Sequence, residues 1–194
     1  MTYETESMKE VSSIAKTIRE RRTIREFKSD PVSVEAITDI LNDAVWAPNH
    51  GFREPWRFIL FQGEAKEQFI EAVSEASTAE QIKKWGEMKA QYYRNVPIHL
   101  VVVMKEDPRQ KQWEEDFSAT SALIQNFQLL AWEKNIGVVW KTNGYNFDPR
   151  FHKAIGIEPG EKIVGTLHVG YFDKKPKAKP RTDIEKKLTI VPEL

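Results

Sequence analysis

The sequence predicts a mixed fold, α/β or α+β, in a single domain that spans residues 1–194. Stretches with apolar residues at three- and four-residue spacing alternate loosely with shorter stretches of branched and aromatic residues, which is the pattern of helices interleaved with strands. The chain shows no internal repeat and no low-complexity linker that would divide it. A chain of this length can bury roughly 70% of the surface that its unfolded form exposes. We therefore expect a central sheet of about four strands flanked by helices.

Two amphipathic helices are expected first. From Ser7 to Glu20 the apolar spacing predicts a helix with one buried stripe. Asp30-Pro31 then interrupts the chain, and Ser33 is a suitable residue to cap a second helix. Its apolar positions run from Ile37 to Val45, and Pro48 marks its end. A polar loop follows.

The rest of the chain predicts four strands and three more helices. The expected strands are Trp56–Phe61, Ile98–Met104, Val138–Lys141 and Ile163–Tyr171. The expected helices are Ala65–Ala76, Ala79–Arg94 and Phe117–Glu133. The last helix is apolar nearly all round, which predicts that it is covered on most sides, and another subunit is one candidate for that cover. Asn135 and Gly137 are expected to end it, and the Lys- and Pro-rich tail 173–181 is expected to be extended.

The composition excludes several classes of protein and site. The absence of cysteine excludes disulfides, thiolate catalysis and zinc sites built on cysteine, and the four histidines are far apart, so we expect no metal site. The 29 basic residues are matched by 29 acidic ones, which argues against a general binder of polyanions. The N-terminus is acidic without the apolar core of a secretory signal, and no apolar run approaches the roughly 20 residues of a membrane helix. These features predict a cytoplasmic protein.

The densest charged feature is the arginine-rich segment between the first two helices. It contains Arg19, Arg21, Arg22 and Arg25, with the hydroxyl of Thr23 among them. Guanidinium groups bind phosphate through paired, charge-assisted hydrogen bonds. The alternative is a solvated basic helix end, because cations are also favoured near helix C-termini. A second basic segment, 173–181, lies far away in the sequence, and one bound phosphate could draw the two together.

Three other segments carry candidate ligand groups. The loop 47–56 is framed by prolines and offers Asn49 and His50, although a lone histidine can equally satisfy a backbone group. Residues 140–144 follow a predicted strand, a common place for ligand groups in open sheets, with an ordinary strand-to-loop transition as the alternative. The tail offers Lys174, Lys175, Lys177, Lys179 and Arg181, and its alternative is a solvated charged tail.

The sequence contains no string typical of a P-loop, a Rossmann glycine loop, an HExxH zinc site or a nucleophile elbow. The acidic run 114–116 falls among basic residues and is typical of a surface. We therefore assign no catalytic side chain. If the protein is an enzyme, a cofactor is expected to carry the difficult chemical step.

These segments, in this order, resemble the flavin-dependent nitroreductase-like family, and within it the small NAD(P)H nitroreductases. The matching strings are Arg21-Arg22-Thr23-x-Arg25-x-Phe27, Ala47-Pro48-Asn49-His50 with Glu54-Pro55-Trp56-x-Phe58, Gly137-Val138-Val139-Trp140-Lys141-Thr142, Ile163-Val164-Gly165 with Gly170-Tyr171, and Lys179-Pro180-Arg181. The similarity covers roughly residues 17–181.

The resemblance implies an α+β nitroreductase-like fold with a central, mainly antiparallel sheet of about four to five strands, in an intertwined homodimer that binds FMN at its interface. The implied activity is hydride transfer from NADH or NADPH through FMN to a nitroaromatic, quinone or similar electron-poor small molecule, by a ping-pong mechanism. Nucleic acid and membranes are not implied as partners. The implied FMN-binding residues are Arg21, Arg22, Thr23 and Arg25 at the phosphate and ribityl chain, Lys179 and Arg181 closing on the phosphate, Asn49 and His50 beside the flavin, and Trp140, Lys141 and Thr142 near its ring.

Three positions depart from the family pattern. Glu54 stands where the family commonly has Gln, Asn49-His50 replaces a frequent pair of small hydroxyl residues, and the bulky Trp140 lies near the expected substrate path. Other functions remain open at this point: a flavin-binding or storage protein without turnover, and a related flavin enone or aldehyde reductase. A nucleic-acid binder that uses the arginine-rich segment with Tyr92-Tyr93-Arg94 is a third possibility.

Overall fold

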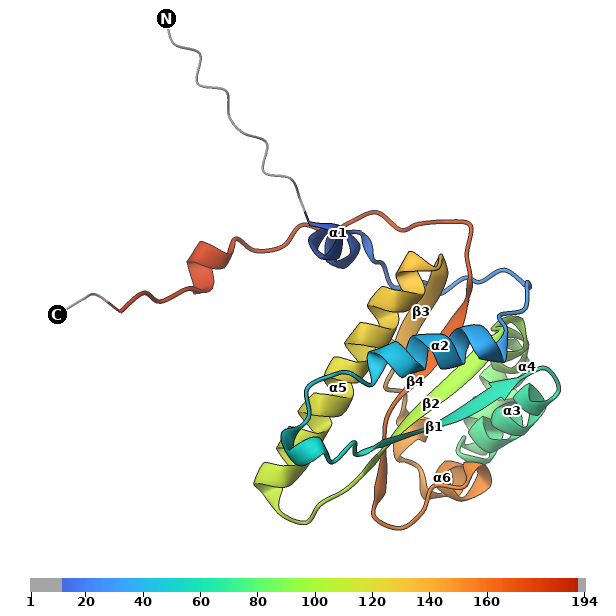
Figure 1. Cartoon of the computed structure of the whole chain (residues 1–194). Coiled ribbons are helices and arrows are strands. Elements are labelled where there is room, and N and C mark those ends of the chain that lie inside the picture. Colours follow the sequence, from blue (N-terminus) through green and yellow to red (C-terminus); the bar gives the residue numbers. More distant parts are fainter. Residues whose placement is uncertain (1–11, 192–194) are drawn as a thin grey trace, which may run out of the picture.

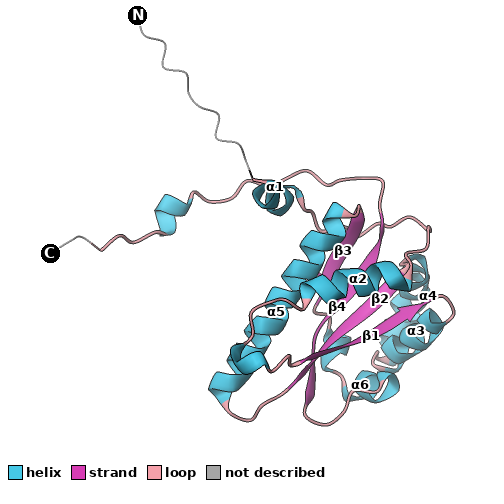
Figure 2. Cartoon of the chain, in the orientation of Figure 1, coloured by secondary structure: helices cyan, strands magenta, loops and turns pink. Residues whose placement is uncertain are grey.

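The computed structural model describes residues 12–191, so the predicted helical residues 7–11 lie outside the described part. Its centre is a fully antiparallel sheet in the order β1-β2-β4-β3 (Figures 1 and 2). The strands found in residues 12–191 are β1 (Trp56–Gln62), β2 (Ile98–Lys105), β3 (Ile136–Lys141) and β4 (Glu161–Tyr171). The predicted α+β class and the antiparallel sheet of about four strands are confirmed.

Helices cover both faces of this sheet (Figure 1). One face carries α2 (Val34–Ala44) and α5 (Gln110–Glu133), and the other carries α3 (Ala65–Glu75), α4 (Ala79–Asn95) and α6 (Pro149–Ile155). Helix α1 (Ser13–Glu20) lies at the C-terminal end of α5, where the Thr17 hydroxyl donates to a Glu133 carboxylate oxygen at 3.0 Å. Short 3-10 turns are η1 (His50–Phe52), η2 (Gly144–Phe147) and η3 (Ile184–Lys187). After β4 the chain runs back past α1 before it leaves the body (Figure 1).

The core consists of two apolar layers, one on each face of the sheet. Strand β2 contributes to both, with Leu100 and Val102 under α2 and α5, and Val101 and Val103 under α3, α4 and α6. Side chains alternate along a strand, so a strand buried on both faces needs a continuous apolar run instead of an alternating one. The uninterrupted stretch in the sequence therefore corresponds to a central strand.

Several expectations about the helices are wrong in detail. Helix α5 begins at Gln110, well before the expected start, because the buried Asp116 gives its charged first turns a contact with the body. Helix α6 was not predicted, although Asp148 caps it by accepting from the backbone N–H of Arg150 at 2.8 Å and Gly156 ends it at φ 74°. Asp-Pro before a short helical run and Gly after it are recognisable boundary signals.

The predicted buried stripe of the first helix is not buried within the single chain. Ile14 and Ile18 are 67% and 51% exposed, and none of the described residues of α1 is buried. An amphipathic helix whose apolar face is exposed to water lacks the stabilisation that burial of this face would give. The stripe is therefore an uncovered apolar face of this chain.

Gly137 lies inside β3 and does not end α5, which stops at Glu133 with Asn135 in the left-handed region at φ 57°. A Cβ at Gly137 would come 2.6 Å from a side-chain carbon of Ile24. The missing side chain lets the arginine-rich segment approach β3, where the Ile24 N–H donates to the Val138 carbonyl at 3.2 Å and Thr23 forms a parallel bridge. Gly137 thus places this segment at the edge of the sheet.

Candidate functional site

A cleft with basic walls lies between the segment after α1 and the C-terminal tail. Its volume is about 580 Å³, and no acidic residue is found among the described side chains that line it. The cationic residues of this basic cleft are Arg19, Arg21, Arg22, Arg25, Lys177, Lys179 and Arg181, with Thr23 beside them. The structure therefore brings together the two basic segments that are far apart in the sequence.

Two guanidinium groups of the basic cleft carry buried N–H donors that no described residue accepts. Arg21 donates through Nη1 to the Gln128 amide oxygen of α5 at 3.3 Å, and Arg22 donates through Nη1 to the backbone carbonyls of Arg19 and Arg21 at 2.6 and 2.8 Å. The Nε atoms of both arginines are buried and have no acceptor within residues 12–191. Since buried donors in proteins are almost always paired, these two indicate that an acceptor binds in the cleft.

The cations of the cleft also destabilise one another. Burial lowers the pKa of Arg21, and the neighbouring charges of Arg22 and Arg181 lower it further. A bound dianion would relieve this repulsion and accept the free N–H groups, and phosphate matches the paired donors of guanidinium geometrically. The residues present therefore fit a phosphate group.

At the end of β3, Trp140 and Lys141 point to opposite faces of the sheet. The Trp140 indole N–H donates to the Val164 carbonyl at 3.2 Å, and its ring fills the space that a side chain at Gly165 would need. Lys141 faces α4, with Nζ 5.9 Å from the centre of the Tyr92 ring. Burial and then the charge of Arg25 lower the pKa of Lys141. Lys141 therefore lies near Arg25, while Trp140 is packed into the sheet.

The polar loop 49–54 lies beside the N-terminal half of α5. Asn49 is used locally: its side-chain oxygen accepts from the Glu54 N–H at 3.1 Å, and its amide donates to the Ala47 carbonyl at 3.3 Å. Phe52 and Glu54 have φ values of 51° and 44°, which cost on the order of 1 to 3 kcal/mol each in a non-glycine residue. Such strain is concentrated at functional sites, which makes this loop a candidate for ligand contact.

The predicted site residues thus fall in two places within one chain. Asn49 and His50 line an open groove of about 810 Å³ with Ser118 of α5, whereas Arg21 contacts Gln128 near the other end of that helix. At 1.5 Å per residue, Ser118 and Gln128 are roughly 15 Å apart along α5. A single chain does not bring Asn49 and His50 to the basic cleft. Thr142 is exposed just beyond β3.

Sequence reasoning missed two contributors to these sites. Gln128 is only 7% exposed and holds Arg21, and its signal was a polar residue within the apolar stretch of α5. Arg53 binds Asp116 across a long separation in sequence, and no local pattern marks such a pair.

Within residues 12–191, no helix combines the length and the apolar character needed to cross a membrane.

Comparisons with known proteins agree on one family. Residues 18–171 match the sequence profile described as "Nitroreductase family". The chain is 40% identical to "Putative NAD(P)H nitroreductase YfhC" of Bacillus subtilis (strain 168), over 96% of this chain and 98% of that protein. A crystal structure of a nitroreductase-like family protein from Bacillus cereus is 46% identical, with a TM-score of 0.91 over 95% of this chain and 99% of that chain.

A more distant solved structure shares the fold. It is the FMN- and NADPH-dependent nitroreductase NfnB from Sphigopyxis sp. strain HMH, with 17% identity and a TM-score of 0.76 over 93% of this chain and 100% of that chain. The profile covers most of the chain, and the Bacillus subtilis relative is similar along nearly its whole length. This protein is therefore a member of the nitroreductase family.

Proposed function

We propose that this protein is an FMN-dependent oxidoreductase that passes hydride equivalents from NADH or NADPH to nitroaromatics, quinones or similar electron-poor acceptors by a ping-pong mechanism. The observation that carries the proposal is the basic cleft, with seven cations, no acidic lining residue in the described chain, and two buried guanidinium donors without acceptors. Family membership and the FMN-dependent nitroreductase of the same fold support it.

The basic cleft would hold the FMN phosphate. Arg21 and Arg22 would donate to its oxygens from the sheet side, while Lys179 and Arg181 would close on it from the tail. The Thr23 hydroxyl in the lining is a further donor for the phosphate or the ribityl chain. These contacts neutralise charge and fix the position of the cofactor.

Bound FMN would supply the two-electron chemistry, so the protein's own task is orientation and charge. Lys141 lies at the end of β3, close enough to Arg25 of the basic cleft for the two charges to interact. Fixed positive charge near the ring would stabilise the negative charge that develops when the ring is reduced. The exposed Thr142, just beyond the same strand end, would border the ring, whereas Trp140 is packed into the sheet on the face opposite Lys141.

We expect a yellow protein whose colour is bleached when NADH or NADPH is added without oxygen. The visible absorbance of FMN would be lost as the donor's hydride is transferred, and a nitroaromatic or quinone would restore it. Anaerobic absorbance spectroscopy with each nucleotide measures this. A yellow protein that neither nucleotide bleaches would be a storage protein, and selective reoxidation by enones or aldehydes would indicate that related activity. A colourless protein that binds single-stranded nucleic acid would contradict the proposal.

We also expect the protein to be a homodimer in which each copy completes the site of the other. Trp46 and Phe52 are 87% and 91% exposed, and the α1 face with Ile14 is uncovered, so the single chain presents apolar surface near both halves of the site. A two-fold arrangement with antiparallel α5 helices would bring Asn49 and His50 of one copy to the basic cleft of the other. Sedimentation at micromolar concentration should give twice the chain mass of 22.5 kDa. A monomer that retains FMN and is bleached by NAD(P)H would contradict this arrangement.

A further inference from the structure

The loop 49–54 is attached to α5 by a bidentate ion pair between Arg53 and Asp116. Arg53 Nε donates to Asp116 Oδ1 at 3.0 Å, and Nη2 donates to Asp116 Oδ2 at 2.9 Å. Only 2% of the Asp116 side chain is exposed, against 34% for Arg53. The hydrogen bonds to Asp116 raise the pKa of Arg53. A buried carboxylate therefore has its principal partner on this loop.

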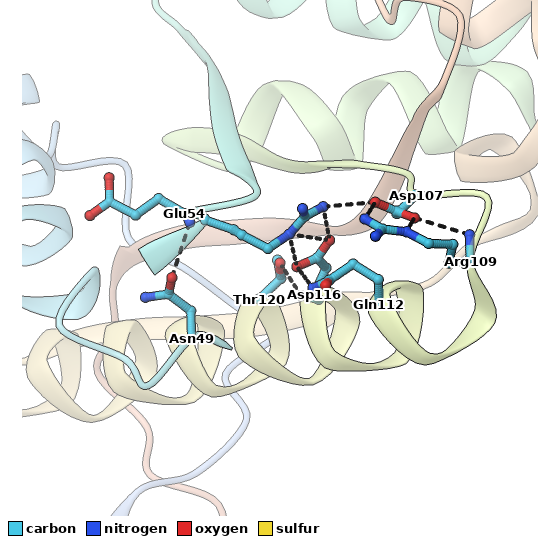
Figure 3. A network of polar contacts seen from close by, with 8 residues as sticks. Asn49, Glu54, Asp107, Arg109, Gln112, Asp116 and Thr120 are labelled. Atoms are coloured by element: carbon cyan, nitrogen blue, oxygen red, sulfur yellow. Dashed lines mark hydrogen bonds and ion pairs between the residues drawn. The ribbon is translucent and has the colours of Figure 1, made fainter. Parts of the chain in front are cut away.

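Neighbouring groups fix both members of the pair. Gln112 donates to Asp116 Oδ1 at 3.2 Å, one turn earlier on α5. Arg53 also donates to Asp107 at 3.1 Å, and Asp107 is held in turn by the side chain of Arg109. Figure 3 shows these acidic groups converging on one guanidinium from α5 and from the turn before it. The anchor of the loop is thus held by polar contacts from α5 and from the turn before it.

Apart from this pair, the loop has little that holds it. Residues 50–54 are exposed, and Phe52 packs on nothing in the described chain, with 91% of its surface open. The bond from the Glu54 N–H to Asn49 lies within the loop and does not attach it to the body. Phe52 and Glu54, on either side of Arg53, both have positive φ. An exposed, strained segment relaxes unless an attachment prevents it, and Arg53 is that attachment.

We propose that Arg53 and Asp116 are positioning residues, which hold the loop 49–54 in the strained shape that presents it to the flavin of the partner subunit. This inference rests on the proposed function. The pair does not touch the cofactor, and it acts through the place and the orientation of Asn49 and His50. An apolar anchor would serve stability equally well, whereas a two-pronged ion pair also fixes the direction in which the loop leaves the helix.

Arg53→Lys tests this directly, because lysine keeps the charge beside the buried Asp116 and loses the planar two-pronged contact. In the flavin-free protein, amide hydrogen exchange in the segment 49–54 should become about tenfold faster or more. In the FMN-loaded protein, affinity for FMN should stay within about threefold because the phosphate residues are untouched, while the rate of flavin reduction by NAD(P)H should fall about tenfold or more through misplacement. Asp116→Asn should give the same pattern and serves if Arg53→Lys does not fold.

Arg57→Lys is the matched control. Arg57 forms an equivalent pair with Glu161, donating through Nε at 2.6 Å, but it belongs to β1 and its pair does not hold the loop. Its substitution should lower the thermal midpoint and leave loop exchange and flavin reduction as in the wild type. Equal effects of Arg53→Lys and Arg57→Lys on exchange and reduction, or a mobile loop with wild-type reduction, would overturn the proposal. A wild-type protein without bound FMN would instead show that the proposed function is wrong, and it would remove the positioning role with it.

Discussion

Arg21→Ala is expected to raise the dissociation constant of FMN by about 10- to 150-fold, because a charge-assisted hydrogen bond is worth roughly 1.5 to 3 kcal/mol. Arg21 is half-buried against α5, and its buried Nε has no acceptor in the described part of the chain, so it is poised to donate to the phosphate. Fluorescence titration of the flavin-free protein with FMN measures the change. The thermal midpoint without FMN shows whether the variant is folded.

Arg19→Ala is the matched control for this substitution, since it removes the same charge from the same cleft. Arg19 is exposed, and its side chain makes no hydrogen bond with another described residue, so its loss should change the dissociation constant of FMN by less than about threefold. Arg25→Ala should weaken binding more than Arg19→Ala, because Arg25 lines the cleft and its charge also acts on Lys141. Equal affinities for all three variants would mean that only the summed charge matters, and the residue assignment would then be wrong.

The protein is expected to lose stability steeply as the pH falls below about 6.5. His99 and His168 are fully buried, and their rings lie 4.8 Å apart. Burial lowers the pKa of His99 to about 3 and that of His168 to about 2, with further lowering from Lys66 and from His99, respectively. Unfolded histidine binds a proton near pH 6.5 while both buried rings stay neutral, so acid favours the unfolded chain.

The sign and size of the effect follow from this difference in bound protons. The two neutral histidines add their full contribution to the free energy of unfolding above pH 6.5. This contribution declines from there to about pH 3, where His99 is protonated in the folded protein as well. Each histidine contributes a slope of about 1.4 kcal/mol per pH unit, so the pair removes roughly 5 kcal/mol between pH 6.5 and 4.5. That is comparable with the whole free energy of unfolding of many domains.

Urea unfolding at pH values from 7.5 to 4.5 measures this slope. His168→Gln should reduce the decline in unfolding free energy by about half, because one titrating group is lost while an amide remains opposite the Tyr92 hydroxyl. His50→Gln, at an exposed position, is the control and should keep the wild-type slope. An unchanged slope in His168→Gln would assign the acid sensitivity to carboxylates in ion pairs such as that of Arg57 with Glu161.

The sheet and the basic cleft were predictable because each rests on a strong local signal. A run such as Ile98–Met104 can bury both faces only as a central strand, and it does. Each of the two basic segments carries more cations than acids, and the structure brings both to one cleft, with the Lys175–Glu20 ion pair of 3.5 Å linking them. In both cases the composition of a short stretch determined where it could lie.

The rest of the site depends on distances that no local pattern records. Asn49 and His50 occur between the two basic segments in sequence, yet α5 holds them away from the cleft in the single chain. In the sequence Arg53 is typical of a solvent-exposed charged residue, and only the fold shows that its partner Asp116 is buried. The exposed stripe of α1 shows the same limit, since periodicity predicts that a face is apolar without telling which chain covers it.

The central position of the β2–β4 pairing has a consequence for how the chain reaches its native state. Ile98–Lys105 must pair with Glu161–Tyr171 across the intervening α5, β3 and α6, so the middle of the sheet closes the longest loop of the three strand pairings. Closing long loops is slow because entropy is lost before contacts compensate for it. Until then the apolar run of β2 is an open template for pairing with other chains. Pairing with another chain is therefore the main hazard for β2 until β4 lies beside it.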